Sequence, residues 1–294
     1  MIYAFIRQHE SEFPAAAACR VLSVSRSGYQ ASLVRPESER AKADRDLTAL
    51  ITASHTASRQ TYGAPRILDD LRDRGHRVGQ RRVARLMRQA DLRGAFHPRR
   101  TSHTGLPATV DGPDLVRRRF TAEAPDQVWC ADVKQVWTRQ GWVFLAAVID
   151  LHSRRIVGHA CGTSATTALV ERAFAGALQS RRPPSGLVHH SDRGAAYVSG
   201  PFLSSLAAAG AVRSLSRPGT PLDNAVIESF FSTLERELLA RARHATRAEA
   251  RSSLFDYIEV FYNRQRKHST LSYLSPATFE ARSSTLSGVS TEAT

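Results

Sequence analysis

Cysteine is scarce in this chain, and its placement excludes two classes of protein. The 294 residues include three cysteines, Cys19, Cys130 and Cys161, which lie far apart. An odd number of scattered cysteines provides no disulfide framework, and no C-x-x-C or cysteine–histidine spacing typical of a zinc site is present. We therefore expect three small, buried, apolar side chains instead of a disulfide-rich secreted protein or a zinc module.

Long apolar segments are also absent. The longest apolar run covers residues 143–149, far short of the roughly 20 residues that a membrane-spanning helix needs. The apolar amino terminus is soon interrupted by charge, and no cleavable signal sequence follows. We expect a cytoplasmic, nucleoid-associated protein with no membrane partner. A hydrophobic content of 42% still provides a packed core, so the chain is not disordered.

Lysine is missing from the most basic part of the chain. Residues 59–119 contain 15 arginines, no lysine and 6 acids, whereas residues 125–240 contain 11 basic residues and 9 acids. The guanidinium group matches phosphate oxygens and base edges better than an ammonium group does. This contrast indicates a phosphate-binding module joined to a catalytic body, although a generally basic soluble protein is the simpler alternative.

The first 40 residues carry a weak helical pattern. Residues 14–33 are typical of two short helices around a turn, a small helix-turn-helix that Gly28 weakens. A linker rich in Arg, Pro, Glu and Ser is expected over residues 35–45, and a helix over residues 47–58.

Residues 41–95 predict a better-defined helix-turn-helix. Pro65 suits the first turn of a helix that Gly75 ends. The next helix has apolar residues at i, i+3, i+4 and i+7: Val83, Leu86, Met87 and Ala90. Its opposite face is basic, as in a recognition helix placed in a major groove, although a solvated basic face is the alternative. The predicted DNA contacts here are Arg81, Arg82, Arg85 and Arg88.

Residues 96–124 lose this periodicity and collect Pro, Gly, Thr and Arg. They predict an interdomain linker in which Arg117, Arg118 and Arg119 follow a DNA backbone.

Residues 125–240 predict a mixed sheet. Three strand-like runs, 127–138, 142–150 and 154–161, are joined by short turns and should form an antiparallel meander. Helices and strands then alternate: helix 165–180, strand 187–190, helix 202–209, strand 212–215, and a long helix that Asp223 caps and that ends near Arg241. The fold class is α/β, a five-stranded sheet with helices on both faces.

Three acids occupy special places in this pattern: Asp132, Asp192 and Glu228. The first two are separated by 59 residues and the last two by 35. Asp132 is expected mid-strand, where an unpartnered carboxylate is costly, and Asp192 at the strand end where α/β sheets bind ligands. Glu228 lies on the flank of the last helix. Each alone could be an ordinary paired, turn or solvated acid, but together they indicate one site.

Carboxylate oxygens without a nearby cysteine suit Mg²⁺ or Mn²⁺. Two such ions can activate the attacking oxygen and stabilise the leaving oxygen of a phosphoryl transfer. We therefore expect a two-ion site held by the three acids. His189 and His190 border it on opposite faces of their strand and are expected to be structural.

Five motifs resemble OrfB-type insertion-sequence transposases with a DDE, retroviral integrase-like catalytic core: W-C-A-D-V-K, G-W-V-F-L-A-A-V-I-D-L-H-S-R-R-I-V-G, H-S-D-R-G-A-A-Y-V-S, D-N-A-V-I-E-S-F-F-S-T-L-E-R-E and Y-N-R-Q-R-K-H-S-T-L-S-Y-L-S-P. T-Y-G-A-P-R-I and R-R-V-A-R-L-M-R-Q-A-D-L-R-G are similar to the same family's helix-turn-helix. The resemblance implies an RNase H-like fold, with Asp132, Asp192 and Glu228 as metal-binding catalytic acids. It also implies DNA cleavage and strand transfer without a covalent protein intermediate.

Departures from the family pattern are Ala131 and Lys134. Lys134 could lower the pKa of Asp132 or bind substrate phosphate. The terminal cluster Tyr262, Asn263, Arg266, Lys267 and His268 could contact DNA or pack against the site, and the sequence leaves both open. The further predicted DNA contacts are Lys134, Arg193, Arg266 and Lys267.

The predicted protein is a transposase that acts on the terminal inverted repeats of an insertion sequence and on target DNA, as a homo-oligomer. An upstream OrfA-type protein or fusion is a further expected partner. The alternatives are a structure-specific nuclease of the same fold and a non-catalytic helix-turn-helix regulator. The expected domains are a helical segment 1–40, a helix-turn-helix 41–95, a linker 96–124, a catalytic core 125–240 and a helical extension 241–294.

Overall fold

The computed structural model describes residues 2–34, 36–95 and 112–289. It forms two compact units, residues 1–53 and 54–294, and the boundary falls inside one helix. Of the linker predicted over residues 96–124, the part from residue 96 to residue 111 lies outside the described residues.

The first unit is helical. It contains α1 (Ile2–Gln8), α2 (Ala15–Val21), α3 (Arg26–Val34) and the start of α4 (Glu39–Ala57). Ile6, Cys19 and Tyr29 form its small core. The two short helices predicted between residues 14 and 33 are confirmed. The linker predicted over residues 35–45 is wrong from Glu39 onward, because the Ser38 hydroxyl accepts the Ala41 N–H and starts a helix there.

The second unit begins with the predicted helix pair, α5 (Ala64–Asp73) and α6 (Gln80–Gln89). The apolar faces are buried as expected, and Gly75 follows α5 with a φ of +81° that suits glycine. Ala90 is an exception: α6 ends at Gln89, so Ala90 is exposed and does not extend the buried face.

A five-stranded sheet forms the body of this unit, with strand order β3-β2-β1-β4-β5. Its strands are β1 (Val128–Thr138), β2 (Gly141–Asp150), β3 (Ile156–Gly162), β4 (Val188–Ser191) and β5 (Val212–Leu215). β1, β2 and β3 form the predicted antiparallel meander, whereas β4 and β5 run parallel to β1. The RNase H-like mixed sheet expected from the sequence is confirmed.

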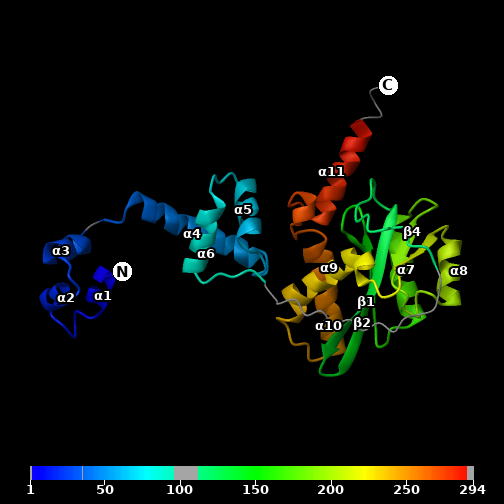
Figure 1. Ribbon diagram of the computed structural model, residues 1–294, viewed down its shortest axis with the longest axis horizontal. Coiled ribbons are helices and arrows are strands. Elements are labelled where there is room, and N and C mark those ends of the chain that lie inside the picture. The colour runs from blue at the N-terminus through cyan, green and yellow to red at the C-terminus, as the bar shows by residue number, and fades with distance from the viewer. Residues whose placement is uncertain (1, 35, 96–111, 290–294) are drawn as a thin grey trace. The chain divides into compact units, whose positions relative to one another are not determined.

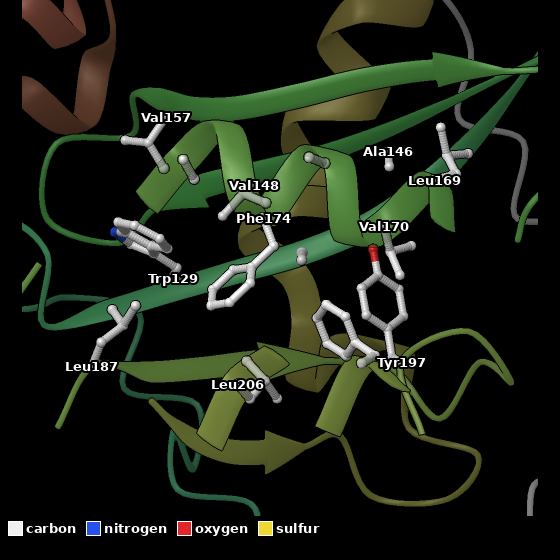
Figure 2. Packing of buried hydrophobic residues seen from close by; sticks show 14 residues of the cluster. Trp129, Ala146, Val148, Val157, Leu169, Val170, Phe174, Leu187, Tyr197 and Leu206 are labelled. Carbon is white, nitrogen blue, oxygen red and sulfur yellow. The ribbon is translucent and has the colours of Figure 1, made fainter. Parts of the chain in front are cut away.

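Helices cover both faces of the sheet (Figure 1). α7 (Thr167–Arg181) and α8 (Gly200–Ala208) lie on one side, and α9 (Ala225–Leu234) and α10 (Arg247–Phe255) on the other. Figure 2 shows the core under α7, where Trp129 of β1 and Val148 of β2 surround Phe174. β3 approaches α7 so closely that a Cβ on Gly158 would lie 2.3 Å from the Ala173 carbonyl oxygen.

The chain after β5 differs from the single long helix that the sequence predicts. A 3₁₀ turn, η1 (Pro221–Asn224), precedes α9, and a π-helix, η2 (Glu235–Leu239), follows it. Asp223 does not cap the helix. Its buried carboxylate instead binds the guanidinium groups of Arg217 and Arg118, at 2.8 Å and 2.9 Å, which outcompete the backbone amides.

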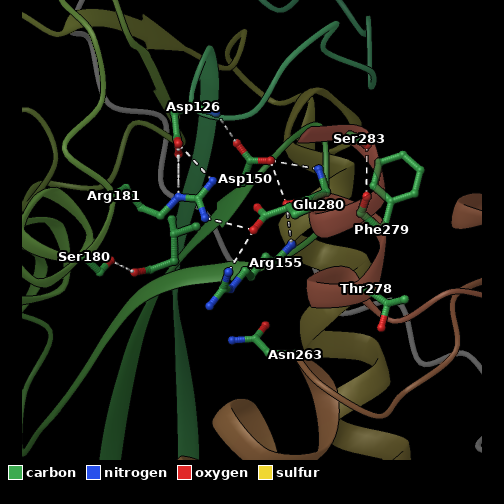
Figure 3. Close-up of polar contacts among 12 residues, drawn as sticks. Asp126, Asp150, Arg155, Ser180, Arg181, Asn263, Thr278, Phe279, Glu280 and Ser283 are labelled. Atoms are coloured by element: carbon green, nitrogen blue, oxygen red, sulfur yellow. Dashed lines mark hydrogen bonds and ion pairs between the residues drawn. The ribbon is translucent and has the colours of Figure 1, made fainter. Parts of the chain in front are cut away.

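The last elements are a second π-helix, η3 (Asp256–Tyr262), a short 3₁₀ turn, η4 (Ser269–Leu271), and α11 (Pro276–Val289). Glu280 of α11 accepts hydrogen bonds from Arg155 and Arg181, at 2.8 Å and 2.9 Å, which ties this helix to the sheet (Figure 3). Asp150, at the end of β2, is fully buried and accepts bonds from Ser153 and from the Asp126 N–H.

Among the described residues, no helix is both long and apolar enough to cross a membrane. All three cysteines are free. Cys19 and Cys130 are buried as expected, but Cys161 is only partly covered.

Candidate active site

Asp132 projects from the middle of β1, where burial is the largest cause that raises the pKa of its carboxyl group. The negative charges of Asp192 and Glu228 also raise this pKa, whereas the Val133 N–H, at 2.7 Å, and Lys134 oppose the shift, and the net result is a pKa of about 7. Residues far apart in the chain therefore act on one carboxylate. The gathering of acids at this point creates a local excess of negative charge.

The register of the parallel strands brings Asp192 beside Asp132. Ala131 of β1 pairs with Ser191 of β4, so the next residue of each strand occupies a neighbouring position. Parallel strands lie about 4.8 Å apart. Asp192 is exposed, and its Oδ1 accepts the Gly194 N–H at 2.9 Å, which orients the carboxylate.

Glu228 lies in the first turn of α9 and is half-buried. One turn earlier, the buried Asn224 side chain donates from Nδ2 to the Ala131 carbonyl oxygen at 3.1 Å. The start of α9 is thus bonded to the residue that precedes Asp132. The sequence analysis did not single out Asn224. Its position in D-N-A-V-I-E, one helical turn before Glu228, was the available signal.

A divalent metal fits this site by donor type. The three carboxylates supply hard oxygen ligands, and a cation would remove the repulsion that raises the pKa of Asp132. Within the part of the chain that the structure describes, however, no three His, Cys, Asp or Glu side chains are grouped closely enough to hold a metal ion. Binding would therefore require the side chains to draw together.

The two histidines near the site have structural surroundings. His189 packs its ring against Phe174 and Phe202, each centroid 5.3 Å away, and burial lowers its pKa to about 3. His190 lies between the hydroxyl groups of Ser214 and Ser216, at 2.8 Å and 3.2 Å. Neither is a free imidazole facing the acids.

Tyr197 is a neighbour of the acids that sequence reasoning missed. It is 4% exposed and belongs to the core shown in Figure 2. Burial raises the pKa of its hydroxyl, and the charges of Asp132 and Asp192 raise it further. Its place in H-S-D-R-G-A-A-Y, five residues after Asp192, was the available signal.

Lys134 forms an ion pair with Glu235 at 3.0 Å and lowers the pKa of Asp132, one of the two effects expected of it. The side chain is about one-third exposed.

The predicted DNA contacts differ in their surroundings. Arg81 and Arg88 are exposed on α6, where Arg85 also bonds Gln89 at 3.0 Å. Arg82 is half-buried on the same helix. Among the linker arginines that the structure describes, Arg117, Arg118 and Arg119 are exposed, and Arg118 is bonded to Asp223. Arg193 donates to the Ser216 carbonyl at 2.9 Å.

The terminal cluster packs against the fold, one of the two interpretations left open. The Asn263 amide bonds both the N–H and the carbonyl of Ile156, each at 2.9 Å. Arg266 is 4% exposed and donates to Glu237 at 2.8 Å and 2.9 Å. A buried, doubly bonded guanidinium offers no donor to a phosphate, so the predicted DNA contact at Arg266 does not match its position. Lys267 is paired with Asp69 and Asp73.

Comparison with known proteins covers almost the whole chain. Family models described as integrase core domain match residues 122–221 and 210–276, and an HTH-like domain model matches residues 42–100. The chain is 40% identical over 268 residues to an uncharacterized 31 kDa protein of insertion element IS600 from Shigella sonnei, covering 90% of this chain and 97% of that protein. It is 36% identical over 286 residues to the transposase InsF for insertion sequence IS3A from Escherichia coli strain K12, covering 95% and 98%.

Solved structures give more distant matches. The catalytic core domain of the HTLV-2 integrase, in complex with magnesium, matches with a TM-score of 0.41 and 16% identity, covering 54% of this chain and 98% of that chain. A simian T-cell lymphotropic virus intasome matches with a TM-score of 0.46 and 12% identity, covering 77% and 72%.

Proposed function

The chain belongs to the IS3 family of insertion-sequence transposases, and we propose that Asp132, Asp192 and Glu228 are its catalytic acids. A transposase with an integrase core is a polynucleotidyl transferase that cleaves DNA strands and joins them to a target. The observation that carries the proposal is the double link to Ala131: Ser191 pairs with it across the sheet, and Asn224 bonds its carbonyl. Both links bring an acid toward Asp132.

An integrase-type core suggests a divalent metal cofactor, and we propose Mg²⁺ or Mn²⁺, two ions, held by the oxygens of these three acids. When bound, such ions activate the attacking oxygen and neutralise charge on the phosphate and the leaving oxygen. The protein's own part is to keep the ligands ionised and oriented. The Val133 N–H orients Asp132 and favours its charged form, and the Gly194 N–H orients Asp192.

DNA binding belongs to the helix-turn-helix and integrase domains, and we assign its contacts to arginines that are exposed or, for Arg85, half-buried. Arg81, Arg85 and Arg88 on α6 are proposed to read the terminal inverted repeats, and Arg117 and Arg119 to contact phosphates. Lys134 and Arg193, near the acids, are proposed to hold the cleaved strand. Two ends must be cut and joined together, so the proposed active form is a homo-oligomer, with an OrfA-type protein as a further partner.

The acids can be tested one at a time with substitutions of nearly equal volume: Asp132→Asn, Asp192→Asn and Glu228→Gln. We expect strand cleavage in Mg²⁺ to fall by about 10²-fold or more in each, because each loses one charge of the site. Binding to the end sequence should remain within about twofold, since phosphate and base contacts by arginine carry it. Glu123→Gln, an exposed acid outside the site, is the matched control.

Cleavage is measured on an end-labelled duplex, and strand transfer by the joined product on a denaturing gel. A joined product separates a transposase from a structure-specific nuclease, because hydrolysis alone leaves no joined strand. Undiminished cleavage in any one of the three variants would contradict the assignment of that acid.

A further inference from the structure

The T-Y-G-A-P-R-I segment at the start of α5, expected to serve the helix-turn-helix, turns its polar groups toward the protein. Tyr62 is 5% exposed, and its hydroxyl donates to the Gln265 carbonyl at 3.1 Å and accepts the Lys267 N–H at 2.8 Å. Arg66 Nε donates to the Lys267 carbonyl at 2.9 Å. These two side chains are therefore committed to the backbone of residues 265–267, about 200 residues later in the chain.

A second set of contacts uses charge. Lys267 extends its ammonium group to both Asp69 and Asp73, which lie one turn apart on α5. The lysine side chain is 13% exposed, and the carboxylates are 27% and 68% exposed. Burial alone would lower the pKa of Lys267, but its two partners outweigh burial and raise it. Lys267 thus stays charged between the acids.

Glu237 connects this interface to the helix of the active site. It lies on η2, which continues α9, nine residues after Glu228. Its side chain, 4% exposed, accepts two bonds from Arg266 and one from the Tyr257 hydroxyl at 2.8 Å, and Arg66 approaches to 4.0 Å. A continuous set of bonds therefore runs from α5 through residues 265–267 to the helix that carries Glu228.

Bonds of this kind hold α5 and residues 265–267 in one relative orientation more strictly than apolar contacts would. Apolar patches hold two elements together in several neighbouring positions, whereas buried ionic and bidentate bonds are directional and costly to leave unmade. α6 packs on α5 through buried apolar residues of both helices, so it shares the orientation of α5.

We propose that these contacts form a latch, defined by Tyr62, Arg66, Asp69, Asp73, Glu237, Arg266 and Lys267, that sets the distance between the DNA sequence read by α6 and the phosphodiester that is cut. The inference rests on the proposed function of α6 and of the three acids. The latch residues are positioning residues: they act through helix placement and touch neither DNA nor the reacting atoms.

The test is a map of cleavage positions on an end-labelled duplex at single-nucleotide resolution. The latch variant is Asp69→Asn/Asp73→Asn, which removes both partners of Lys267 without changing side-chain volume. Its control is Asp70→Asn/Asp91→Asn, which removes the same charge from acids near α6 that pair locally with Arg74 and Arg93. Tyr62→Phe is an independent latch variant that leaves charge unchanged.

The wild type and the control should cut at one main position. The latch variants should bind the end as the control does but spread their cuts over neighbouring phosphodiesters, with severalfold less product at the main position. Insertion of one or two base pairs between the recognised sequence and the terminus should move the cut with the recognised sequence in the wild type, and less strictly in the latch variants.

A folded latch variant that cuts at the single wild-type position, with the wild-type response to insertions, overturns the inference. Should the double variant unfold, Asp73→Asn alone, whose carboxylate is largely exposed, provides the same comparison. A wild type that cuts no end contradicts the proposed function itself, which distinguishes that failure from failure of the latch.

Discussion

At the scale of single residues, the partners that surround a buried side chain decide whether it is charged. His189 is 1% exposed among aromatic rings, and no residue that the structure describes forms a hydrogen bond with its Nε2. Its pKa is lowered by burial to about 3. Asp223 shows the opposite case: its two guanidinium partners hold its pKa below the ordinary range, although burial opposes them. The partner, and not the degree of burial alone, decides the charge.

The low pKa of His189 predicts a loss of stability in acid. Between pH 3 and pH 6.5 the unfolded chain binds a proton that the folded chain does not, so the free energy of unfolding decreases as pH falls below 6.5. By pH 5 this residue should account for about 2 kcal/mol. His189→Phe removes this titration. The substitution breaks no hydrogen bond between Nε2 and the residues that the structure describes.

Urea unfolding at pH 8 and pH 5 measures the effect. The decrease between the two pH values should be smaller in His189→Phe than in the wild type. The half-buried His268, whose pKa is also lowered by burial, titrates equally in both proteins and cancels in the comparison. Equal decreases would contradict a neutral, buried His189.

At the scale of elements, the packing of α7 on β3 depends on a missing side chain. A Cβ on Gly158 would lie 2.3 Å from the Ala173 carbonyl and 2.8 Å from the Ala177 nitrogen, both backbone atoms that cannot move aside easily. Gly176, on the exposed side of α7, has no atom of the described residues within 4 Å of its Cβ position. An added Cβ would therefore clash with backbone atoms at Gly158 but not at Gly176.

Gly158→Ala should lower the free energy of unfolding by about 1–3 kcal/mol, because the helix must shift away from the sheet. Gly176→Ala should raise it by about 0.5–1 kcal/mol, because alanine favours a helix more than glycine does. Urea or thermal unfolding of both variants checks the pair. A neutral Gly158→Ala would mean that β3 and α7 are not in close contact.

At the scale of the whole molecule, the basic residues and the three acids of the proposed site are concentrated in different parts of the chain. The net charge of +14 is concentrated in the arginine-rich part of the chain, whereas Asp192 and Glu228 lie near enough to Asp132 for their charges to raise its pKa. Arg81 and Arg88 are exposed on α6, and α6 is anchored through α5 to residues 265–267. Binding and cleavage can then be separated by mutation.

Arg81→Ala should weaken binding to the end sequence by about 1–3 kcal/mol and reduce its preference over an unrelated duplex, because a base contact is lost. Arg251→Ala, an exposed arginine on α10, is the control and should leave that preference unchanged. Competition binding at two fixed salt concentrations measures the preference for the end sequence over the unrelated duplex. An equal loss on both duplexes would assign Arg81 to the phosphate backbone.

Much of the fold was predictable because its signals are local. Strand-like runs joined by short turns located β1, β2 and β3, and helical spacing of apolar residues located α6. The error at Asp223 occurred where a local rule met a distant partner. Asp223 has the residue type of a helix cap but is bound by Arg217 and by Arg118, 105 residues away. The change from α9 to the π-helix η2 likewise has no signature in apolar spacing.

Residue types and their spacing were enough to predict most of the strands and helices, the basic character of α6 and the separation of Asp132, Asp192 and Glu228, since these depend on neighbouring positions. Which side chains contact each other was visible only in the folded chain. Asn224 bonds a residue 93 positions earlier, and Arg266 bonds Glu237 across 29 positions. Periodicity is a property of a few turns, whereas these pairs depend on which faces pack and which donors burial leaves without water.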